Sequence, residues 1–373
     1  MQGRLNWTGQ VNYNDLFEPP FSMNNTGPWS LLLVWCFAFT TVQRGRRICL
    51  LFSKNQMMYL HQMRPNFNVF KLFIIIFTLS CNKPAGRVIA IHPLPGYPSG
   101  SGLACHNGQI YLMGDDAPYM LVTDSLLNVL DRTDVFASTG KRIAKDKKQD
   151  IEAMGLIKMH KIPYLLMLGS GSMSPNRDSC VIMNPMTKEK KYYSLDIFYS
   201  RLRAAGIRDL NIEGVTALPG EIILVSRGNK SFPKNTLIIT SDNFWERQEI
   251  ANFRLIKTGI NRDTSVFTGI SGMDYSYRTD QLLLTVSTED THNSYDDGAI
   301  GKSYLWIINN ISSRKELKGI NPDKIIDLEE IDPRFKGQKI ESVCIVTENK
   351  DQRELVLASD DDKAGTVLFR MLL

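Results

Sequence analysis

The sequence lacks the cysteine spacing of a disulfide framework. Its six cysteines, at positions 36, 49, 81, 105, 180 and 344, include no CxxC pair and follow no regular interval. Small disulfide-stabilised domains show an even set of cysteines at characteristic spacings. The three in the globular part, Cys105, Cys180 and Cys344, are therefore expected to be free, buried thiols.

The main body also lacks an excess of charge of either sign. Residues 1–80 hold seven of the 44 basic and two of the 39 acidic residues, which leaves 37 of each for residues 81–373. Nucleic-acid binding depends on basic surfaces that neutralise phosphates. A neutral body gives no electrostatic reason to expect a nucleic-acid partner.

Familiar catalytic motifs are missing as well. Gly169-Ser170-Gly171-Ser172 does not have the GxSxG order of a serine nucleophile elbow. Gly100-Ser101-Gly102 is too short to hold a phosphate, and the histidines at 92, 106, 160 and 292 share no metal-ligand spacing. No sustained helical period occurs in 86–373 except a short candidate at Ile197–Ala205.

Residues 63–81 have the layout of a bacterial secretory signal. Met63 opens a basic stretch, an apolar run follows from Leu72 to Leu79, and Ser80 precedes Cys81. The small residue before a cysteine resembles a lipoprotein cleavage site, at which Cys81 would be lipidated. The alternatives are a plain signal or a short membrane anchor, although the run is shorter than the ~20 residues that span a bilayer.

Residues 1–62 match nothing downstream. They contain an apolar stretch from Ser30 to Val42, followed by three arginines at 44, 46 and 47. Because one export signal rarely stands behind another, we expect Met63 to be the true start and 1–62 an over-extended gene start. The alternative is a short first membrane segment with a cytoplasmic basic flank.

The body, residues 82–373, repeats one short motif five times: a Ser or Glu, a small residue and a hydrophobic residue. Isoleucine precedes four of the five motifs. A strand that ends in polar residues follows each motif, then a third strand, and in four units a fourth element. The motifs begin at Ser101, Glu152, Glu213, Ser271 and Glu341.

Such repeats of four short strands predict an all-β fold, a β-propeller of about five blades. The fifth repeat stops at Leu373 after its third strand. We expect the missing strand to come from Arg87–Ile91, which would close the ring and remove exposed sheet edges. The long fourth interval leaves room for a sixth blade. The propeller is expected to be a monomer.

The innermost strands of a propeller surround one channel, so the first motif residues should form a ring there. Its members are Ser101, Glu152, Glu213, Ser271 and Glu341. Close carboxylates must pair with cations, take up protons or bind metal. Glu152, Glu213 and Glu341 are candidate ligands of a hard cation such as calcium. The alternative is that each Glu accepts hydrogen bonds from backbone amides of the next blade.

A second set of polar residues follows the second strand of each unit and should lie on one face. Acid-rich turns there are often only turn formers, because Asp side chains bond their own backbone. Arg227 stands out as a cation among acids, which would suit a phosphate, a carboxylate or an ion pair with a neighbouring blade. The candidates are Asp115, Asp116, Arg227, Asn229, Glu289, Asp290 and Asp360.

The recurring Ile-Glu-Ala-Met (151–154), Ile-Glu-Gly-Val (212–215) and Ile-Ser-Gly-Met (270–273) resemble the esterase-like phytase domain family and related propeller lipoproteins of bacterial envelopes. The resemblance implies a secreted or envelope location and, in some members, calcium-assisted hydrolysis of phosphate esters. By motif, Glu152, Glu213 and Asp116 match the family's acids. The second and third repeats depart from it, with Gly169-Ser170-Gly171 and Arg227-Gly228-Asn229 where acids are usual.

Two functions remain open. The first is a non-catalytic propeller, tethered to an envelope membrane by lipid, that binds a small ligand or an envelope protein. The second is a calcium-dependent phosphoesterase in which Arg227 or Lys302 engages phosphate and the metal orients a water molecule. The missing acids and the lipoprotein-type leader favour the first.

Overall fold

The computed structural model describes residues 36–43, 46–53, 85–138, 140–259, 267–289, 300–314, 319–360 and 365–373. The chain divides into two compact units, 1–81 and 82–373. In the first unit, β1 (Cys36–Gln43) and β2 (Arg46–Ser53) form an antiparallel pair. The predicted signal, Cys81 included, lies outside the described residues. None of the described helices is long and apolar enough to cross a membrane.

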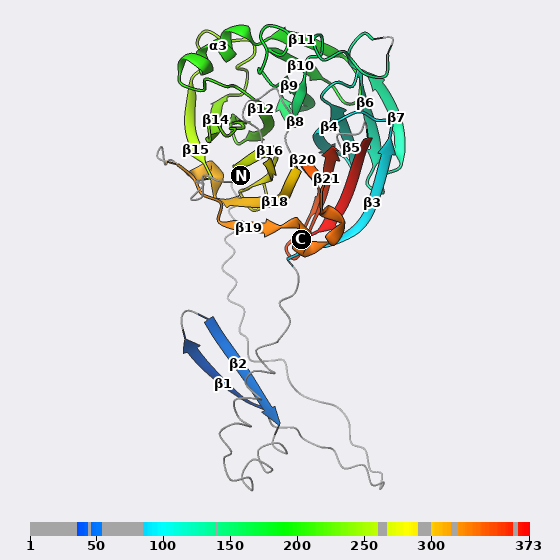
Figure 1. Cartoon of the computed structure of the whole chain (residues 1–373). Helices are drawn as coiled ribbons and strands as arrows, with labels where there is room; N and C mark the ends of the chain where they lie inside the picture. Colours follow the sequence, from blue (N-terminus) through cyan, green and yellow to red (C-terminus); the bar gives the residue numbers. More distant parts are fainter. Residues whose placement is uncertain are drawn as a thin grey trace, which may run out of the picture. The chain divides into compact units, whose positions relative to one another are not determined.

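The second unit is a ring of five four-stranded antiparallel sheets, which confirms the propeller and settles its blade number at five (Figure 1). Blade 1 contains β4 (Gly100–His106), β5 (Gln109–Gly114), β6 (Tyr119–Asp124) and β7 (Val129–Asp134). Blade 2 contains β8 (Ile151–Met159), β9 (Ile162–Gly169), β10 (Ser179–Met183) and β11 (Lys190–Ser194). Blade 3 contains β12 (Ile212–Leu218), β13 (Glu221–Ser226), β14 (Asn235–Ser241) and β15 (Phe253–Thr258).

The last two blades follow the same order. Blade 4 contains β16 (Thr268–Ser276), β17 (Gln281–Glu289), β18 (Ile300–Asn309) and β19 (Lys324–Asp327). Blade 5 contains β20 (Lys339–Glu348), β21 (Arg353–Asp360), β22 (Gly365–Leu372) and β3 (Arg87–Pro95). Helix α3 (Asp196–Ala204) is the predicted short helix, and α4 (Leu328–Ile331), η1 (Ile311–Ser313) and η2 (Pro333–Phe335) are single turns.

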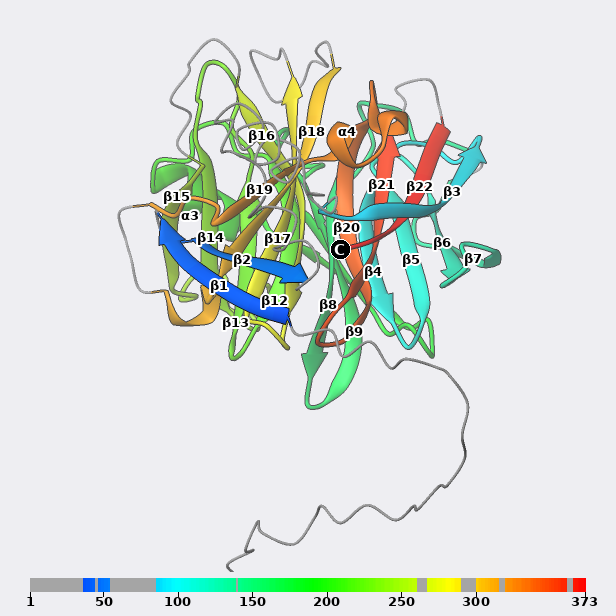
Figure 2. The same ribbon diagram turned by 90° about the horizontal axis from the view of Figure 1, so that it is seen from below.

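The ring closes as the sequence predicted. Strand β3, from the beginning of the body, pairs antiparallel with β22 at its end, with Phe369 opposite Ile91. The view along the perpendicular direction shows β3 beside β22 at the edge of blade 5 (Figure 2). Closure leaves no blade incomplete, so residues 82–373 contain every strand that the ring needs.

The five motifs have one structural explanation. In each innermost strand the register shifts at the first motif residue, which is a β-bulge. A bulge takes one residue out of the ladder and re-aims its side chain. The third motif residue is buried between blades in every repeat: Leu103, Met154, Val215, Met273 and Val343.

The small second motif residue allows adjacent innermost strands to approach. A β-carbon added at Gly272 would lie 2.5 Å from the Glu341 carbonyl oxygen, and one at Gly102 would lie 2.8 Å from Cβ of Met154. In both cases the obstacle belongs to the next blade. The hydrophobic core is accordingly divided into clusters that lie between neighbouring blades. Cys180 and Cys344 are buried there and Cys105 is half-buried, all as free thiols.

Candidate functional site

The two predicted rings of polar residues lie at the same end of the channel. Innermost strands begin at this end and second strands finish there, with Ile151 opposite Gly169, Ile212 opposite Ser226 and Lys339 opposite Asp360. The innermost strands contact one another around the ring in the order β4, β8, β12, β16 and β20. We call this end of the channel the channel mouth.

Glu213, in blade 3, is bound by donors from its own blade. Asn211 Nδ2 donates to its Oε1 at 2.6 Å, and Arg227 Nη1 lies 3.5 Å from the same atom. Arg227 also reaches blade 4, where its Nη2 donates to Ser287 Oγ at 3.4 Å. Gly269 makes room for this arginine, since a β-carbon there would meet the guanidinium. Arg227 therefore joins blades 3 and 4.

The other blades fill the ring position differently. Lys339 Nζ lies 2.9 Å from Glu341 Oε1. Ser271 Oγ donates to the carbonyl oxygen of Ile340 in the next blade at 2.6 Å, and Ser101 Oγ donates to a carbonyl two residues earlier. Ser101 thus forms a local hydrogen bond and Ser271 a hydrogen bond to the next blade, whereas Glu341 forms an ion pair.

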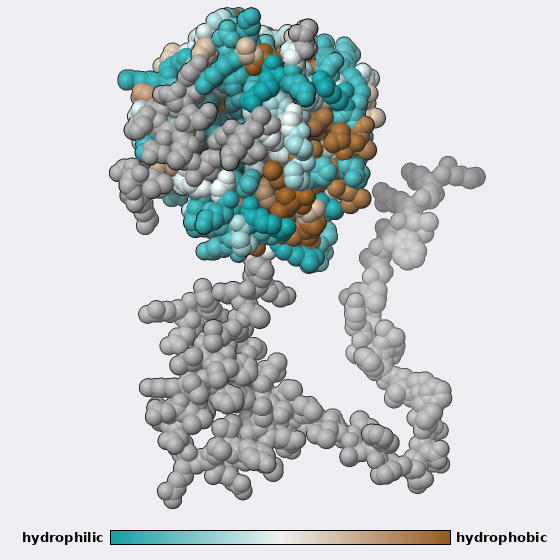
Figure 3. All heavy atoms as spheres, turned by 45° about the vertical axis from the view of Figure 1, so that its right-hand side comes forward, coloured by the Kyte–Doolittle hydropathy of each residue, from teal (hydrophilic) through white to brown (hydrophobic). Residues whose placement is uncertain are grey.

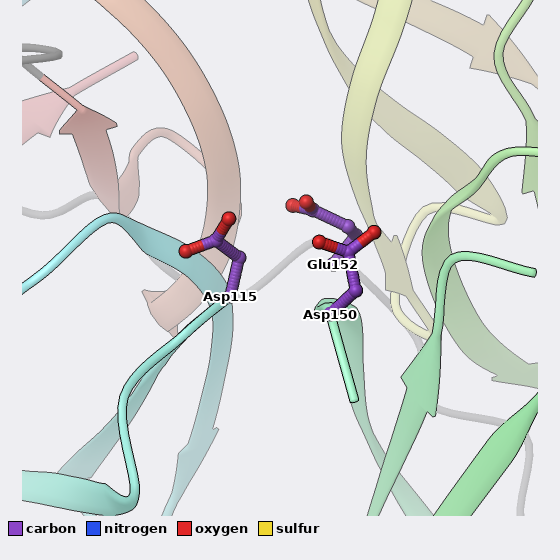
Figure 4. A group of neighbouring side chains, drawn as sticks. All are labelled: Asp115, Asp150 and Glu152. Carbon is purple, nitrogen blue, oxygen red and sulfur yellow. The ribbon is translucent and has the colours of Figure 1, made fainter. Parts of the chain in front are cut away.

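Blade 2 is the exception, because two acids stand where other blades place complementary groups. Asp150 lies two residues before Glu152, in the place that Asn211 and Lys339 occupy in their blades. Carboxylate oxygens of Asp115, Asp150 and Glu152 lie within 4.8 Å of one another. Asp115 faces the other two across the boundary between blades 1 and 2 (Figure 4).

Buried cations neutralise two of these three carboxylates. The Lys148 ammonium bridges Asp115 and Asp150, with 2.6 Å to Asp150 Oδ1. Arg177 Nη1 donates to Asp150 Oδ2 at 2.6 Å, and Ser170 Oγ donates to the same oxygen at 2.5 Å. Lys148 and Arg177 are 10% and 4% exposed at their side chains, so these are desolvated pairs. Asp150 is the centre of the network.

Glu152 is the carboxylate that remains. Among the described residues it receives no hydrogen bond and forms no ion pair, and its side chain is only half-buried. Burial raises its pKa well above the usual value, and the charges of Asp150 and Asp115 add to the rise. Burial also raises the pKa of Asp115 to about 6, against the opposing effect of Lys148. The nearby charge of Lys148 opposes this rise, so the channel mouth holds an acid that feels a cation but, among the described residues, forms no ion pair with one.

The remaining predicted residues have structural partners. Asp116 accepts a hydrogen bond from Arg142 Nε at 2.6 Å. Asn229 donates to Asp209, and its oxygen accepts backbone N–H groups of its own turn. Lys302 Nζ lies 2.7 Å from Asp327 Oδ2, on blade 4.

Three further predicted positions are less informative. Asp360 ends β21 and contributes to the electrostatic environment of Arg142. Glu289 ends β17, and nothing is described of its side chain. Asp290 lies outside the described residues.

The sequence prediction missed Lys148, Asp150 and Arg177. Lys148 and Arg177 lie in loops before β8 and before β10, where no repeat marks them. Asp150 did carry a signal in its position, because it stands two residues before its ring residue, as Asn211 and Lys339 do. In the structure, Asn211 and Lys339 contact their ring residues directly. Asp150 also has a positive φ of 56°, a conformation that Asp tolerates better than most residues.

The ring does not fit calcium as the sequence prediction placed it. Calcium needs several oxygen ligands that converge on one point. Glu213 is held by Asn211 and Arg227, and Glu341 by Lys339. At the one close group of acids among the described residues, the Lys148 ammonium already occupies the space between carboxylates where a cation would bind.

Comparison with solved structures finds β-propellers at very low sequence identity. A glutaminyl cyclase from Myxococcus xanthus is 9% identical, with a TM-score of 0.42, over 77% of this chain and 95% of that one. A DUF4221 member from Bacteroides vulgatus is 10% identical, with a TM-score of 0.32, over 77% and 98%. Virginiamycin B lyase from Staphylococcus aureus is 7% identical, with a TM-score of 0.34, over 76% and 99%. Similarities of this size carry no functional argument.

Sequence comparison gives a family. None of the curated proteins matches the chain. The match to a family model begins at residue 96, immediately after β3, and continues to the last residue. It covers the remaining strands of all five blades, including both rings of the channel mouth. The model describes the family of unknown function DUF6929, and because it matches residues 96–373 this protein belongs to that family.

Proposed function

We propose that this propeller is a non-catalytic binding module whose channel mouth takes a small ligand carrying an ammonium group. The observation that carries the proposal is Glu152, a half-buried carboxylate without a hydrogen bond or ion pair among the described residues. A carboxylate that is partly shielded from water and forms no ion pair is stabilised when a cation binds to it. An ammonium group supplies both the charge and three hydrogen-bond donors.

The surroundings of Glu152 favour a ligand cation over a bare metal ion. Lys148, Arg177 and Arg227, each at least 90% buried, already pair with the carboxylates of Asp115, Asp150 and Glu213. A small divalent ion needs several carboxylates free of other partners. An amine needs one strong acceptor and neighbouring oxygens; Glu152 is the acceptor, and carboxylate oxygens of Asp115 and Asp150 lie within 4.8 Å of its own.

Replacing Glu152 by glutamine should weaken amine binding at least tenfold, because a hydrogen bond to a charged group contributes about 1.5–3 kcal/mol. The measurement is calorimetric titration of residues 82–373 with putrescine and spermidine. Glu249→Gln removes an exposed acid elsewhere on the propeller and should leave binding unchanged.

The same titration uses calcium chloride and inorganic phosphate as contrasts. Amine binding that survives Glu152→Gln would contradict the proposal. Phosphate binding that requires Arg227, or calcium binding that requires Glu152, would favour the phosphoesterase instead.

The affinity for amines should rise with pH. The pKa of Glu152 is raised, so the acid is protonated at low pH and becomes an anion as the pH climbs through that raised value. The ligand amine stays charged over the same interval, so binding strengthens until the amine itself loses its proton. Affinity that falls from pH 5 to pH 8, or the same pH profile in Glu152→Gln, would overturn this assignment.

We also propose that the propeller is held at a bacterial envelope membrane by lipid on Cys81. The support is the basic stretch, apolar run and Ser80-Cys81 junction of residues 63–81. Cells expressing the full chain should incorporate labelled palmitate into the protein, and Cys81→Ser should abolish the label while leaving the protein folded. Unchanged labelling of the variant, or no labelling of the parent chain, would remove the anchor from the proposal.

A further inference from the structure

One side of the propeller exposes large hydrophobic residues on the outermost strands of two adjacent blades. Ile89 of β3 is 38% exposed, and Val129 and Leu130 of β7 are 50% and 53% exposed. Leu126, in the turn before β7, is 61% exposed. We call these four residues the apolar rim. Figure 3 shows hydrophobic side chains gathered on this side of the propeller.

The two strands that carry the apolar rim are neighbours in space. Both cartoon views place β3 and β7 side by side (Figures 1 and 2). Arg370 of β22 lies opposite Ala90 of β3 in the sheet. Its charge also reaches Asp124, whose pKa is lowered first by hydrogen bonds from Asn128 and further by Arg370. Blades 5 and 1 therefore meet where the rim residues lie.

Leu126 is held outward by a well-ordered turn. Asp124 Oδ1 accepts backbone N–H groups of Leu126 at 2.9 Å and of Asn128 at 2.8 Å. Leu127 adopts a positive φ of 71° and is fully buried, which leaves Leu126 at the tip of the turn. A leucine fixed in this way loses little conformational entropy when an apolar phase covers it.

The position of β3 in the chain indicates what covers the apolar rim. Cys81, the proposed lipidation site, lies only six residues before Arg87, where β3 begins. Six residues span at most about 20 Å, so a lipid on Cys81 keeps Arg87, the first residue of β3 and two residues before Ile89, within that distance of the bilayer surface. Membrane binding strengthens with the apolar area that enters the interface, and one acyl chain needs a second contact for stable anchoring, which exposed apolar side chains close to the anchor would supply.

We propose that the apolar rim rests on the lipid bilayer and fixes the orientation of the propeller against it. This proposal rests on the lipid anchor proposed above, but the contact it describes belongs to the propeller alone. The apolar side chains of Leu126, Val129 and Leu130 enter the interfacial layer, and the channel mouth keeps a constant position relative to the membrane.

The test uses residues 82–373, which contain the complete ring and no Cys81. Wild type is sedimented with vesicles of phosphatidylethanolamine and phosphatidylglycerol, beside the double variant Leu126→Gln with Leu130→Gln. Leu126 and Leu130 are 61% and 53% exposed, so lipid can cover about half of each side chain, and their loss should lower the partition coefficient at least about tenfold. The matched control, Met186→Gln with Ile250→Gln, removes two residues that are each 69% exposed on other blades and should bind as wild type does.

The possible results separate the two proposals. Vesicle binding that depends on Leu126 and Leu130 supports the rim even if Cys81 proves unlabelled in cells, which would then overturn only the anchor. No binding by wild type, or an equal loss in the Met186 and Ile250 control, overturns the rim. Concentration-dependent dimerisation that the leucine variant loses, without vesicle binding, would assign the rim to a second copy and also overturn the bilayer contact.

Discussion

Replacing Asp150 by alanine is expected to lower the free energy of unfolding by about 3–5 kcal/mol, the cost of removing one partner from a buried ion pair. The Asp150 carboxylate accepts hydrogen bonds from Arg177 and Ser170 and pairs with Lys148. Alanine leaves the Arg177 guanidinium, 4% exposed, facing an apolar methyl group. Lys148 retains Asp115, so the loss falls mainly on the side of Arg177.

Urea denaturation of residues 82–373 measures this loss, because the shift of the midpoint multiplied by the slope m gives the change in the free energy of unfolding. Asp150→Asn keeps one acceptor oxygen and a side chain that tolerates the positive φ of 56°, so it should lose less than alanine. Asp242→Ala removes an exposed aspartate and should stay within about 0.5 kcal/mol of wild type. A shift below about 1 kcal/mol for Asp150→Ala would mean that the network does not hold blades 1 and 2 together.

Gly272→Ala is expected to cost about 3 kcal/mol, the upper end of the range for overpacked interiors. The added methyl group would lie 2.5 Å from the Glu341 carbonyl oxygen and 2.7 Å from Ser342 Cα. Both atoms belong to the backbone of β20, which is paired with β21 and cannot withdraw without disturbing blade 5. The clash therefore separates two innermost strands.

Gly269→Ala gives a matched comparison three residues earlier in the same strand, β16. There the new methyl group would lie 2.3 Å from Nε of Arg227, a side-chain atom that can shift where the β20 backbone cannot. The expected loss of stability is therefore smaller and comes from weaker contacts of Arg227 with Glu213 and Ser287. Thermal unfolding of both variants under the same conditions tests the difference. Equal losses at the two positions would show that the backbone contact at Gly272 is not what limits the packing of blades 4 and 5.

The propeller was predictable from the sequence because each blade packs its innermost strand against the next blade with the same residue types. A bulge residue, a small residue and a buried hydrophobic residue recur in each innermost strand where it packs against the innermost strand of the next blade, as at Glu213-Gly214-Val215. The closing strand was predictable because β22 had no partner in its own repeat. Repetition thus made a long-range pairing visible in one sequence.

The candidate site was predictable only in part, because its decisive contacts are not repeated. Glu152 was found as a ring member, but its difference from Glu213 and Glu341 depends on which partners the loops deliver. Lys148 and Arg177 come from two loops of different length, and nothing in their local sequence indicates that both reach Asp150. Because these charged residues come together only through the paths of loops, they form no repeating pattern in the sequence.

The pairing of β3 with β22 also determines how the chain can be rearranged. Arg87 lies opposite Leu372, so the two ends of the ring are already neighbours in one sheet. A short linker could join them, and new ends could be opened in an exposed hairpin such as Asn107-Gly108 between β4 and β5. Such a circularly permuted propeller would have blade 5 continuous in sequence and blade 1 divided between the two ends. In the natural order, by contrast, a growing chain leaves the ring open until its last strand has been synthesised.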